Sequence, residues 1–293
     1  MASDQNLITI GQSAALLPDR EGVLALSYVL DCSPGMVRAR EHHRLTSQQM
    51  HRYLSIVERR RSGMPLQYAI GEWEFYGHLF ATDSRALIPR PETELLVERV
   101  LQEELGGRVI ADLGTGTGAI ALTLALEAHP SPARILATDL SAAALSLAAE
   151  NAARLKVAPH LVQWVQGDGP RALPESVDVL VSNPPYIDPA DRESLQRELR
   201  YEPEMALYTG EPGGGGLAIY ADWIPQLPLF MNAGGKVMFE IGDQQAKDVG
   251  GLLIQHGFQD VSVAQDYAGR DRIVSACWPG AENGADHRGR KHV

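Results

Sequence analysis

The chain has 293 residues, of which 44% are hydrophobic and 22% charged, a composition typical of a globular protein with one large domain and a smaller one. Residues 1–85 contain nine acidic and nine basic side chains, so the net charge of −11 belongs to the remainder and argues against stable binding of bare nucleic acid. Two distant cysteines, and no recognisable signal peptide or membrane-spanning run, predict a cytoplasmic protein without disulfides, bound metal or membrane contact. We expect it to be a monomer.

Residues 1–72 predict a small helical domain. Apolar residues recur at helical spacing in 23–30 and again in 50–57, and Ser47 is the expected N-cap of the second of these helices. Three consecutive arginines at 59–61 suit two interpretations. They form the solvated end of a helix, where cations offset the helix dipole, or they form a local basic patch.

A β-hairpin and a rigid linker are predicted for residues 73–91. The first part is rich in aromatic and apolar residues on either side of a Tyr-Gly-His turn. Two prolines then fix an extended chain, and a helix is expected to begin at Glu92 or Thr93 and to run to about Leu105. The linker either only connects the two domains or also walls a pocket, with Arg90 and Glu92 available for polar contacts.

A glycine-rich turn between a predicted strand and a predicted helix is the first strong sign of a ligand site. Glycines let the backbone approach a ligand closely, and this context is typical of nucleotide-binding turns. The spacing is G-x-G-x-G and differs from the G-x-G-x-x-G pattern of dinucleotide sites. The predicted cofactor-binding residues of the turn are Gly114, Thr115, Gly116, Thr117 and Gly118.

Two acidic residues follow the next two predicted strands. The strand at 134–139 ends in Asp139, whose carboxylate suits two ribose hydroxyls. The strand at 161–165 leads to Asp168, whose carboxylate suits an adenine amino group, with Gly169 beside it. Contacts to a neutral adenosine without a phosphate site indicate S-adenosylmethionine as the cofactor rather than NAD.

An Asn-Pro-Pro-Tyr corner is the centre of the predicted site. Residues 177–181 predict a buried parallel strand, and Asn183 lies at its carboxyl end. The Asn183 side-chain oxygen and the Pro184 carbonyl suit one planar NH2 group, and Tyr186 can lie flat against its π-system. We predict Asn183, Pro184 and Tyr186 as catalytic, the same residues with Pro185 as the substrate site, and Asn183 also as a cofactor contact. From these residues alone, the corner holds an amide or a base amine, or it is only a turn.

The remaining sequence completes an α/β domain predicted for residues 92–279. Four glycines at 213–216 follow no strand and precede no Lys-Ser/Thr pair, so we predict a flexible loop rather than a phosphate loop. Polar residues 280–293 show no periodicity and predict a disordered tail. The other predicted elements are a helix at 217–229, a strand at 236–241, a helix at 244–256 and strands at 261–264 and 272–276.

Four motifs together resemble one family. Asp112 to Gly118, Thr138-Asp139, Ser182 to Asp188 and Leu87 to Glu94 resemble the HemK/PrmC family, the peptide chain release factor N5-glutamine methyltransferases. The resemblance implies a Rossmann-like class I S-adenosylmethionine-dependent methyltransferase sheet with a small N-terminal helical domain. It also implies methyl transfer to the glutamine of the Gly-Gly-Gln motif of release factors, with the helical domain gripping the release factor. One departure is Gly169, where some relatives carry an aromatic residue.

Two other functions compete with this one. Asn-Pro-Pro-Tyr alone is shared with adenine-N6 and guanine-N2 methyltransferases, which act on nucleic acid and need a basic groove and an extruded base. The acidic charge and the lack of a sizeable target-recognition domain argue against that function. The other is a non-catalytic module that only binds S-adenosylmethionine. Such a module has no need of two acceptors and a ring beside the methyl group.

Overall fold

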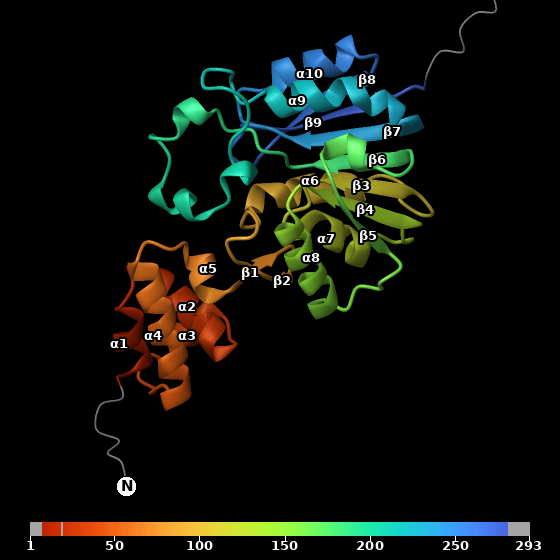
Figure 1. Ribbon diagram of the computed structural model, residues 1–293. Helices are drawn as coiled ribbons and strands as arrows, with labels where there is room; N and C mark the ends of the chain where they lie inside the picture. Colours follow the sequence, from red (N-terminus) through yellow and green to blue (C-terminus); the bar gives the residue numbers. More distant parts are fainter. Residues whose placement is uncertain (1–7, 19, 281–293) are drawn as a thin grey trace, which may run out of the picture.

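The computed structural model describes residues 8–18 and 20–280. The predicted disordered tail therefore lies, from residue 281 onward, outside the described residues. The chain forms a helical unit, then a hairpin, and then a sheet flanked by helices (Figure 1). The helices of the N-terminal unit are α1 (Ile10–Ala14), α2 (Glu21–Leu30), α3 (Pro34–Ala39), α4 (Ser47–Arg61) and α5 (Leu66–Ile70).

The helical unit has an apolar core of its own. Tyr53 of α4 is fully buried in it, and its hydroxyl donates to the Ser13 carbonyl at 2.8 Å. Helix α4 starts with a capping box, in which Thr46 Oγ1 accepts from the Gln49 backbone and the Gln49 side chain accepts from the Thr46 backbone. The prediction of Ser47 as N-cap is wrong by one residue, because only residue 46 stands three positions before that glutamine.

The predicted hairpin is confirmed, and it lies between the helical unit and the sheet. Strands β1 (Glu72–Phe75) and β2 (His78–Ala81) pair antiparallel across a tight turn. Phe75 and Phe80 meet edge-on at a centroid distance of 6.0 Å, and both are buried against the core of the sheet. The hairpin is therefore anchored to the sheet by aromatic packing.

A seven-stranded sheet forms the second unit. Its strands are β3 (Val109–Leu113), β4 (Arg134–Asp139), β5 (Val162–Gln166), β6 (Val177–Ser182), β7 (Met231–Glu240), β8 (Gln259–Gln265) and β9 (Asp271–Trp278). They lie in the order β5-β4-β3-β6-β7-β9-β8. The strands from β5 to β7 run parallel, and β9 is antiparallel to both of its neighbours. Because the chain moves outward from β3 to β5 and then returns to β6 on the other side of β3, the pair β3 and β6 is a topological switch point.

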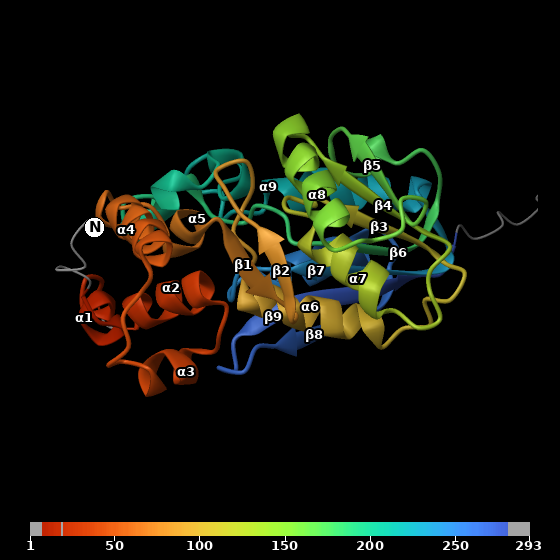
Figure 2. The same cartoon turned by 90° about the horizontal axis from the view of Figure 1, so that it is seen from below.

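Helices cover both faces of the sheet (Figure 1, Figure 2). They are α6 (Pro91–Leu101), α7 (Ala119–Glu127), α8 (Ala142–Arg154), α9 (Ala218–Trp223) and α10 (Ala246–Gln255). Helices α6, α7 and α8 pack on one face, and α9 and α10 pack on the other. The central strands are therefore buried on both faces. Short 3-10 segments lie at Gly169–Ala172, Pro189–Asp191, Arg197–Tyr201, Glu204–Ala206 and Ile224–Leu229.

Two predicted helices differ from the structure in their bounds. Helix α6 begins at Pro91, because a proline needs no N–H at the first helical position, and it ends at Leu101, earlier than predicted. Helix α9 ends at Trp223, and the chain continues to Leu229 in 3-10 form because two prolines there cannot donate backbone hydrogen bonds. Among the described residues, no helix combines the length and the apolar character that crossing a membrane requires.

Candidate active site

The Asn183 corner lies at the switch point of the sheet. Ser182, the last residue of β6, pairs with Leu113, the last residue of β3. The Ser182 hydroxyl donates to the Leu113 carbonyl at 2.6 Å in a buried hydrogen bond, which holds the two strand ends together. Asn183 therefore follows β6 at the point where Gly114, the first residue of the glycine-rich turn, follows β3.

A cavity of about 360 Å³ opens at the carboxyl ends of β3, β4 and β5. Its size is in the range of sites that hold small-molecule ligands. Residues 84–87 of the linker and Trp223 of α9 also line it. The predicted cofactor residues that line this cavity are Gly114, Gly116, Asp139, Asp168, Gly169 and Asn183.

Three other residues of the turn do not line the cavity and instead hold the turn in shape. Thr115 Oγ1 donates to the buried carboxylate of Asp112 at 2.6 Å. The Thr117 carbonyl accepts from the Asn151 side chain at 3.0 Å. Gly118 caps α7 with a φ of 80°, a conformation that favours glycine. Direct contact between this turn and a ligand is therefore expected only from its first two glycines.

Asp139 is held at the end of β4 by two backbone amides. The Gly116 amide donates to Oδ2 at 2.9 Å, and the Ser141 amide donates to Oδ1 at 2.8 Å. Burial raises the pKa of the Asp139 carboxyl group, and these two hydrogen bonds oppose that shift because they stabilise the charged form. Each carboxylate oxygen has a second lone pair, so the group can also accept hydroxyl donors from a ligand in the cavity.

Trp223 fills the space beside Gly169. A Cβ built on Gly169 would lie 2.3 Å from Nε1 of the indole ring. The same Nε1 donates to Oδ1 of Asp168 over a long 3.4 Å, and Arg171 donates to the other carboxylate oxygen at 3.0 Å. An aromatic ring therefore lies next to Asp168, the acid that follows β5, although the residue directly after Asp168 in the sequence is a glycine.

A larger cavity, of about 600 Å³, lies between the helical unit and the Asn183 corner. Pro184 and Tyr186 line this cavity, whereas Asn183 and Pro185 line both cavities. The two cavities therefore adjoin at the corner. Linker residues between 87 and 92 also line the larger cavity, so the linker is a wall of the site as well as a connection.

The Asn183 side chain has a fixed hydrogen-bond partner. Its Nδ2 donates to Thr93 Oγ1 at 3.0 Å, and Thr93 Oγ1 donates to Glu240 Oε2 at 2.7 Å. The Tyr186 hydroxyl makes a longer contact of 3.4 Å with the other oxygen of Glu240. Glu240 is 1% exposed, and burial raises its pKa to about 7. Because Nδ2 of Asn183 is engaged with Thr93, the side-chain oxygen is turned away from that hydroxyl.

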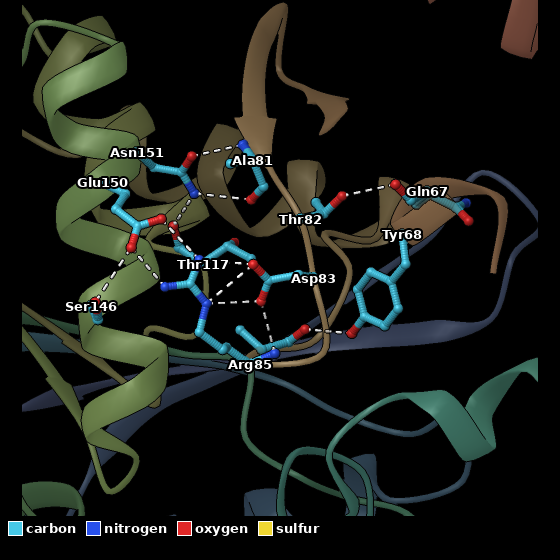
Figure 3. A network of polar contacts seen from close by, with 11 residues as sticks. Gln67, Tyr68, Ala81, Thr82, Asp83, Arg85, Thr117, Ser146, Glu150 and Asn151 are labelled. Atoms are coloured by element: carbon cyan, nitrogen blue, oxygen red, sulfur yellow. Dashed lines mark hydrogen bonds and ion pairs between the residues drawn. The ribbon is translucent and has the colours of Figure 1, made fainter. Parts of the chain in front are cut away.

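A polar network ties the linker to both units (Figure 3). The Tyr68 hydroxyl of α5 donates to the Ala86 carbonyl at 2.6 Å. Arg85 lies between Asp83 and Glu150 of α8, with an N–O distance of 2.7 Å to each. These contacts fix the stretch of linker that lines the smaller cavity.

The glycine run at 213–216 is organised around Asp188. The amides of Gly213 and Gly215 donate to the Asp188 carboxylate at 2.9 and 2.7 Å. The Ala190 amide, which donates at 2.8 Å, and these two glycine amides lower the pKa of that carboxyl group. At Gly216 a Cβ would lie 2.0 Å from the Tyr186 carbonyl oxygen, so no larger residue fits. The loop amides are thus bound to a carboxylate of the chain, and the loop supports the Asn183 corner, while its flexibility stays a prediction.

Of the three arginines in the last turn of α4, Arg59 and Arg61 are exposed, as a solvated helix end predicts, whereas Arg60 is neither solvated in this way nor part of an open basic patch. Its guanidinium pairs with Glu21 of α2 at 2.7 Å and with Glu198 at 3.1 Å, and its side chain is 17% exposed. Nearby, the Tyr201 hydroxyl donates to the Ser62 carbonyl at 2.6 Å. The segment that follows the Asn183 corner therefore reaches back to the helical unit (Figure 1).

Comparison with known proteins identifies relatives of both units. Residues 13–71 match the PrmC N-terminal domain, and residues 91–210 match the methyltransferase small domain. The release factor glutamine methyltransferase of Cereibacter sphaeroides is 40% identical over 263 residues, which cover 89% of this chain and 92% of that protein. The enzyme of the same name from Xylella fastidiosa is 38% identical and covers 96% of this chain and 100% of that protein. The chain belongs to the release factor glutamine methyltransferase family.

Solved structures of other methyltransferases share the fold of this family member. A methyltransferase from Pyrococcus furiosus, 17% identical, superposes with a TM-score of 0.52 over 80% of this chain and 100% of that one. The 16S rRNA N2 G1207 methyltransferase of T. thermophilus, 16% identical, superposes with a TM-score of 0.50 over 71% of this chain and 49% of that one. At such identities the likeness concerns the fold alone. It confirms the predicted class I methyltransferase sheet.

Two residues at the site of this release factor glutamine methyltransferase family member were missed from the sequence. Glu240 had a signal, since it is a single acid at the carboxyl end of an apolar strand, where α/β sheets place their ligands. Trp223 had none. It belongs to helix α9 and lies beside Gly169 only in the folded chain.

Proposed function

We propose that this protein transfers a methyl group from S-adenosylmethionine to the side-chain amide nitrogen, N5, of the glutamine in the Gly-Gly-Gln motif of peptide chain release factors. The relatives that align with most of the chain are named as release factor glutamine methyltransferases. Within the molecule, the observation that carries the proposal is that the two cavities adjoin at Asn183. One is sized for a small cofactor, and the other opens toward the helical unit, from which a side chain of a protein substrate would enter.

The smaller cavity is the proposed site of S-adenosylmethionine, which supplies an electrophilic methyl group on a sulfonium ion. The half-buried carboxylate of Asp139, fixed by two backbone amides, suits the ribose hydroxyls. Asp168 suits the adenine amino group, and the indole of Trp223 suits the face of the adenine ring. The glycines at the start of the turn allow the backbone to lie against the ligand. The lining residues therefore fit an adenosine-containing cofactor.

The Asn183 corner is proposed to hold the substrate amide. An amide nitrogen is a poor nucleophile because its lone pair is delocalised into the carbonyl group. Hydrogen bonds from its two N–H groups to the Asn183 side-chain oxygen and the Pro184 carbonyl orient the nitrogen and stabilise the positive charge that grows on it. The Tyr186 ring packs against the planar amide. Such orientation of reacting groups contributes several kcal/mol, within the limit of roughly 7–11 kcal/mol for proximity effects.

The proposed partner is a folded protein rather than a peptide or a nucleic acid. The walls of the larger cavity come from the helical unit, through Glu21 and Arg60, and from the Asn183 corner. A glycine-flanked glutamine that reaches the corner therefore brings the body of its protein against the helical unit. The net charge of −11 disfavours the alternative substrates, adenine or guanine bases on a phosphate backbone.

The test is methyl transfer from labelled S-adenosylmethionine by the full-length protein. We expect label in an intact release factor, much less label in a short Gly-Gly-Gln peptide, and none in DNA or RNA. Mass spectrometry of the digested product should place the methyl group on the glutamine side chain. The matched control is the same release factor with that glutamine replaced by glutamate, which should take up no label. Label in nucleic acid with the release factor untouched would overturn the proposal in favour of base methylation.

A further inference from the structure

Glu240 is a buried acid that the proposed chemistry does not yet use. It is the last residue of β7, next to β6, and it also lines the larger cavity. Its Oε2 accepts from Thr93 Oγ1 at 2.7 Å, and Thr93 Oγ1 in turn accepts from Asn183 Nδ2 at 3.0 Å. A chain of two hydrogen bonds therefore connects a carboxylate on one strand to the amide that follows the neighbouring strand.

We propose that Thr93 and Glu240 are positioning residues that set which end of the Asn183 amide faces the substrate. This inference rests on the proposed function, because it concerns the acceptor that would hold the substrate NH2 group. It assigns a role to two side chains that do not themselves touch the reacting atoms.

The direction of the hydrogen bonds follows from the donors that are available. An ionised carboxylate only accepts, so Glu240 takes the single hydroxyl hydrogen of Thr93. The hydroxyl then offers a lone pair to Asn183, which must present Nδ2 there and turn its oxygen to the cavity side. The opposite flip would place two acceptors 3.0 Å apart, without a hydrogen between them.

Protonation of Glu240 reverses this preference. A neutral carboxyl group can donate to Thr93, which frees the threonine hydrogen for the side-chain oxygen of Asn183. The amide of Asn183 then presents NH2 to the cavity, where it opposes the NH2 of the substrate. The protonation state of a residue that does not itself hold the substrate NH2 group thus acts through the acceptor that does.

The surroundings of Glu240 place both protonation states within reach of neutral pH. Burial raises the pKa of the carboxyl group to about 7, while the hydrogen bond from Thr93 and the guanidinium of Arg272 work in the opposite direction. The carboxylate of Glu92 adds to the increase. The ionisable side chains that face Glu240 from the surrounding elements are Glu92 on α6, Tyr186 after β6, Tyr220 on α9 and Arg272 on β9.

A matched pair of substitutions at Thr93 tests the relay. Thr93→Val keeps the shape but removes the hydroxyl, and Thr93→Ser keeps the hydroxyl. We expect Thr93→Val to lower kcat for the release factor by about ten- to a hundredfold, as for loss of a preorganised polar group. The KM for the release factor and the Kd for S-adenosylmethionine should change by less than about threefold, since Thr93 lines neither cavity and, of the lining residues, only the Asn183 amide is reoriented. Thr93→Ser should stay near the wild type.

The pH profile of kcat is the readout that a merely structural role would not move. Below pH 7 the wild-type kcat should fall by about tenfold per pH unit, because the ionised fraction of Glu240 falls at that rate. Glu240→Gln is neutral at every pH, and its NH2 group can donate to Thr93 as the neutral carboxyl group does. This variant should therefore lose the acid limb near pH 7 and keep, at every pH, the low kcat that the wild type has when Glu240 is protonated.

The outcomes separate this inference from the function on which it rests. If the wild type does not methylate the release factor, the proposed function is overturned, and the inference falls with it. If the wild type is active and Thr93→Val retains its kcat, only the inference is overturned. An identical acid limb in wild type and Glu240→Gln has the same consequence. Wild-type cofactor affinity in each variant shows that the protein has folded.

Discussion

The indole of Trp223 lies so close to the backbone of Gly169 that the two positions can carry only one ring between them. A Cβ on residue 169 would lie 2.3 Å from Nε1 of Trp223. An aromatic side chain at 169 would therefore exclude this placement of the tryptophan. The glycine and the tryptophan are a matched pair in this chain, and both line the smaller cavity.

Gly169→Ala should weaken the binding of S-adenosylmethionine by tenfold or more. The added methyl group displaces the Trp223 ring, and stacking of an aromatic side chain on a base is worth about 1–3 kcal/mol. The control is Gly107→Ala, because Gly107 also has a positive φ, 71°, but has no atom within 4 Å of its Cβ position. Both variants should lose about 1–2 kcal/mol of stability from backbone strain. Calorimetric titration that gives equal affinities for the two variants would remove the ring from the site.

Asp139→Ala should lose roughly ten- to a hundredfold in affinity for S-adenosylmethionine, because a hydrogen bond to a charged group is worth about 1.5–3 kcal/mol. Burial raises the pKa of Asp139, and the charged form is the better acceptor, so wild-type affinity should also decline as the pH falls toward that pKa. Asp248→Ala, at an exposed carboxylate in the first turn of α10, is the control and should bind normally. Titrations at two pH values measure both effects, and normal binding by Asp139→Ala would contradict the assignment.

Asn183→Ala should bind the cofactor with little change yet lose turnover by about a hundredfold or more, since its oxygen is needed where charge develops. Asn232→Ala is the matched control. Asn232 is exposed at the start of β7, and its side chain donates to Asp178 at 2.9 Å, away from both cavities. Single-turnover rates with saturating cofactor isolate the transfer step. Wild-type rates in Asn183→Ala would refute the proposed role of the corner.

Asp112→Asn should change how stability depends on pH. Burial raises the pKa of Asp112 from 3.8 to about 7, so the folded state binds its proton more tightly than the unfolded state does. The contribution of the protonated Asp112 to the free energy of unfolding is fully present below pH 3.8, and it is lost as the pH rises to about 7. Asparagine cannot titrate. When the pH is raised from 5 to 8, the free energy of unfolding of the variant should therefore increase by about 2–3 kcal/mol relative to that of the wild type. Denaturant titrations at both pH values check this, and parallel curves would show that Asp112 titrates normally.

Short sequence patterns correctly predicted the site residues that lie at the ends of strands. Asn183, which follows the apolar strand β6, and Asp139, at the end of β4, both lie at the carboxyl ends of the sheet strands as expected, because parallel strands end together. The pairing of Trp223 with Gly169 depends on how a helix packs over the sheet, which no short window of sequence encodes. Arg60 was misjudged for the same reason, since its partner Glu198 is distant in the chain.

The linker gives the two cavities a common wall. Leu87 lines both of them, and the neighbouring carbonyl of Ala86 is bonded to Tyr68 in the helical unit. A protein bound to the helical unit and a small molecule bound at the sheet therefore both lie next to the same short stretch of backbone, through which each can affect the binding of the other. If the docked protein changes the affinity for the small molecule by some factor, thermodynamic reciprocity requires that the small molecule changes the affinity for the docked protein by the same factor.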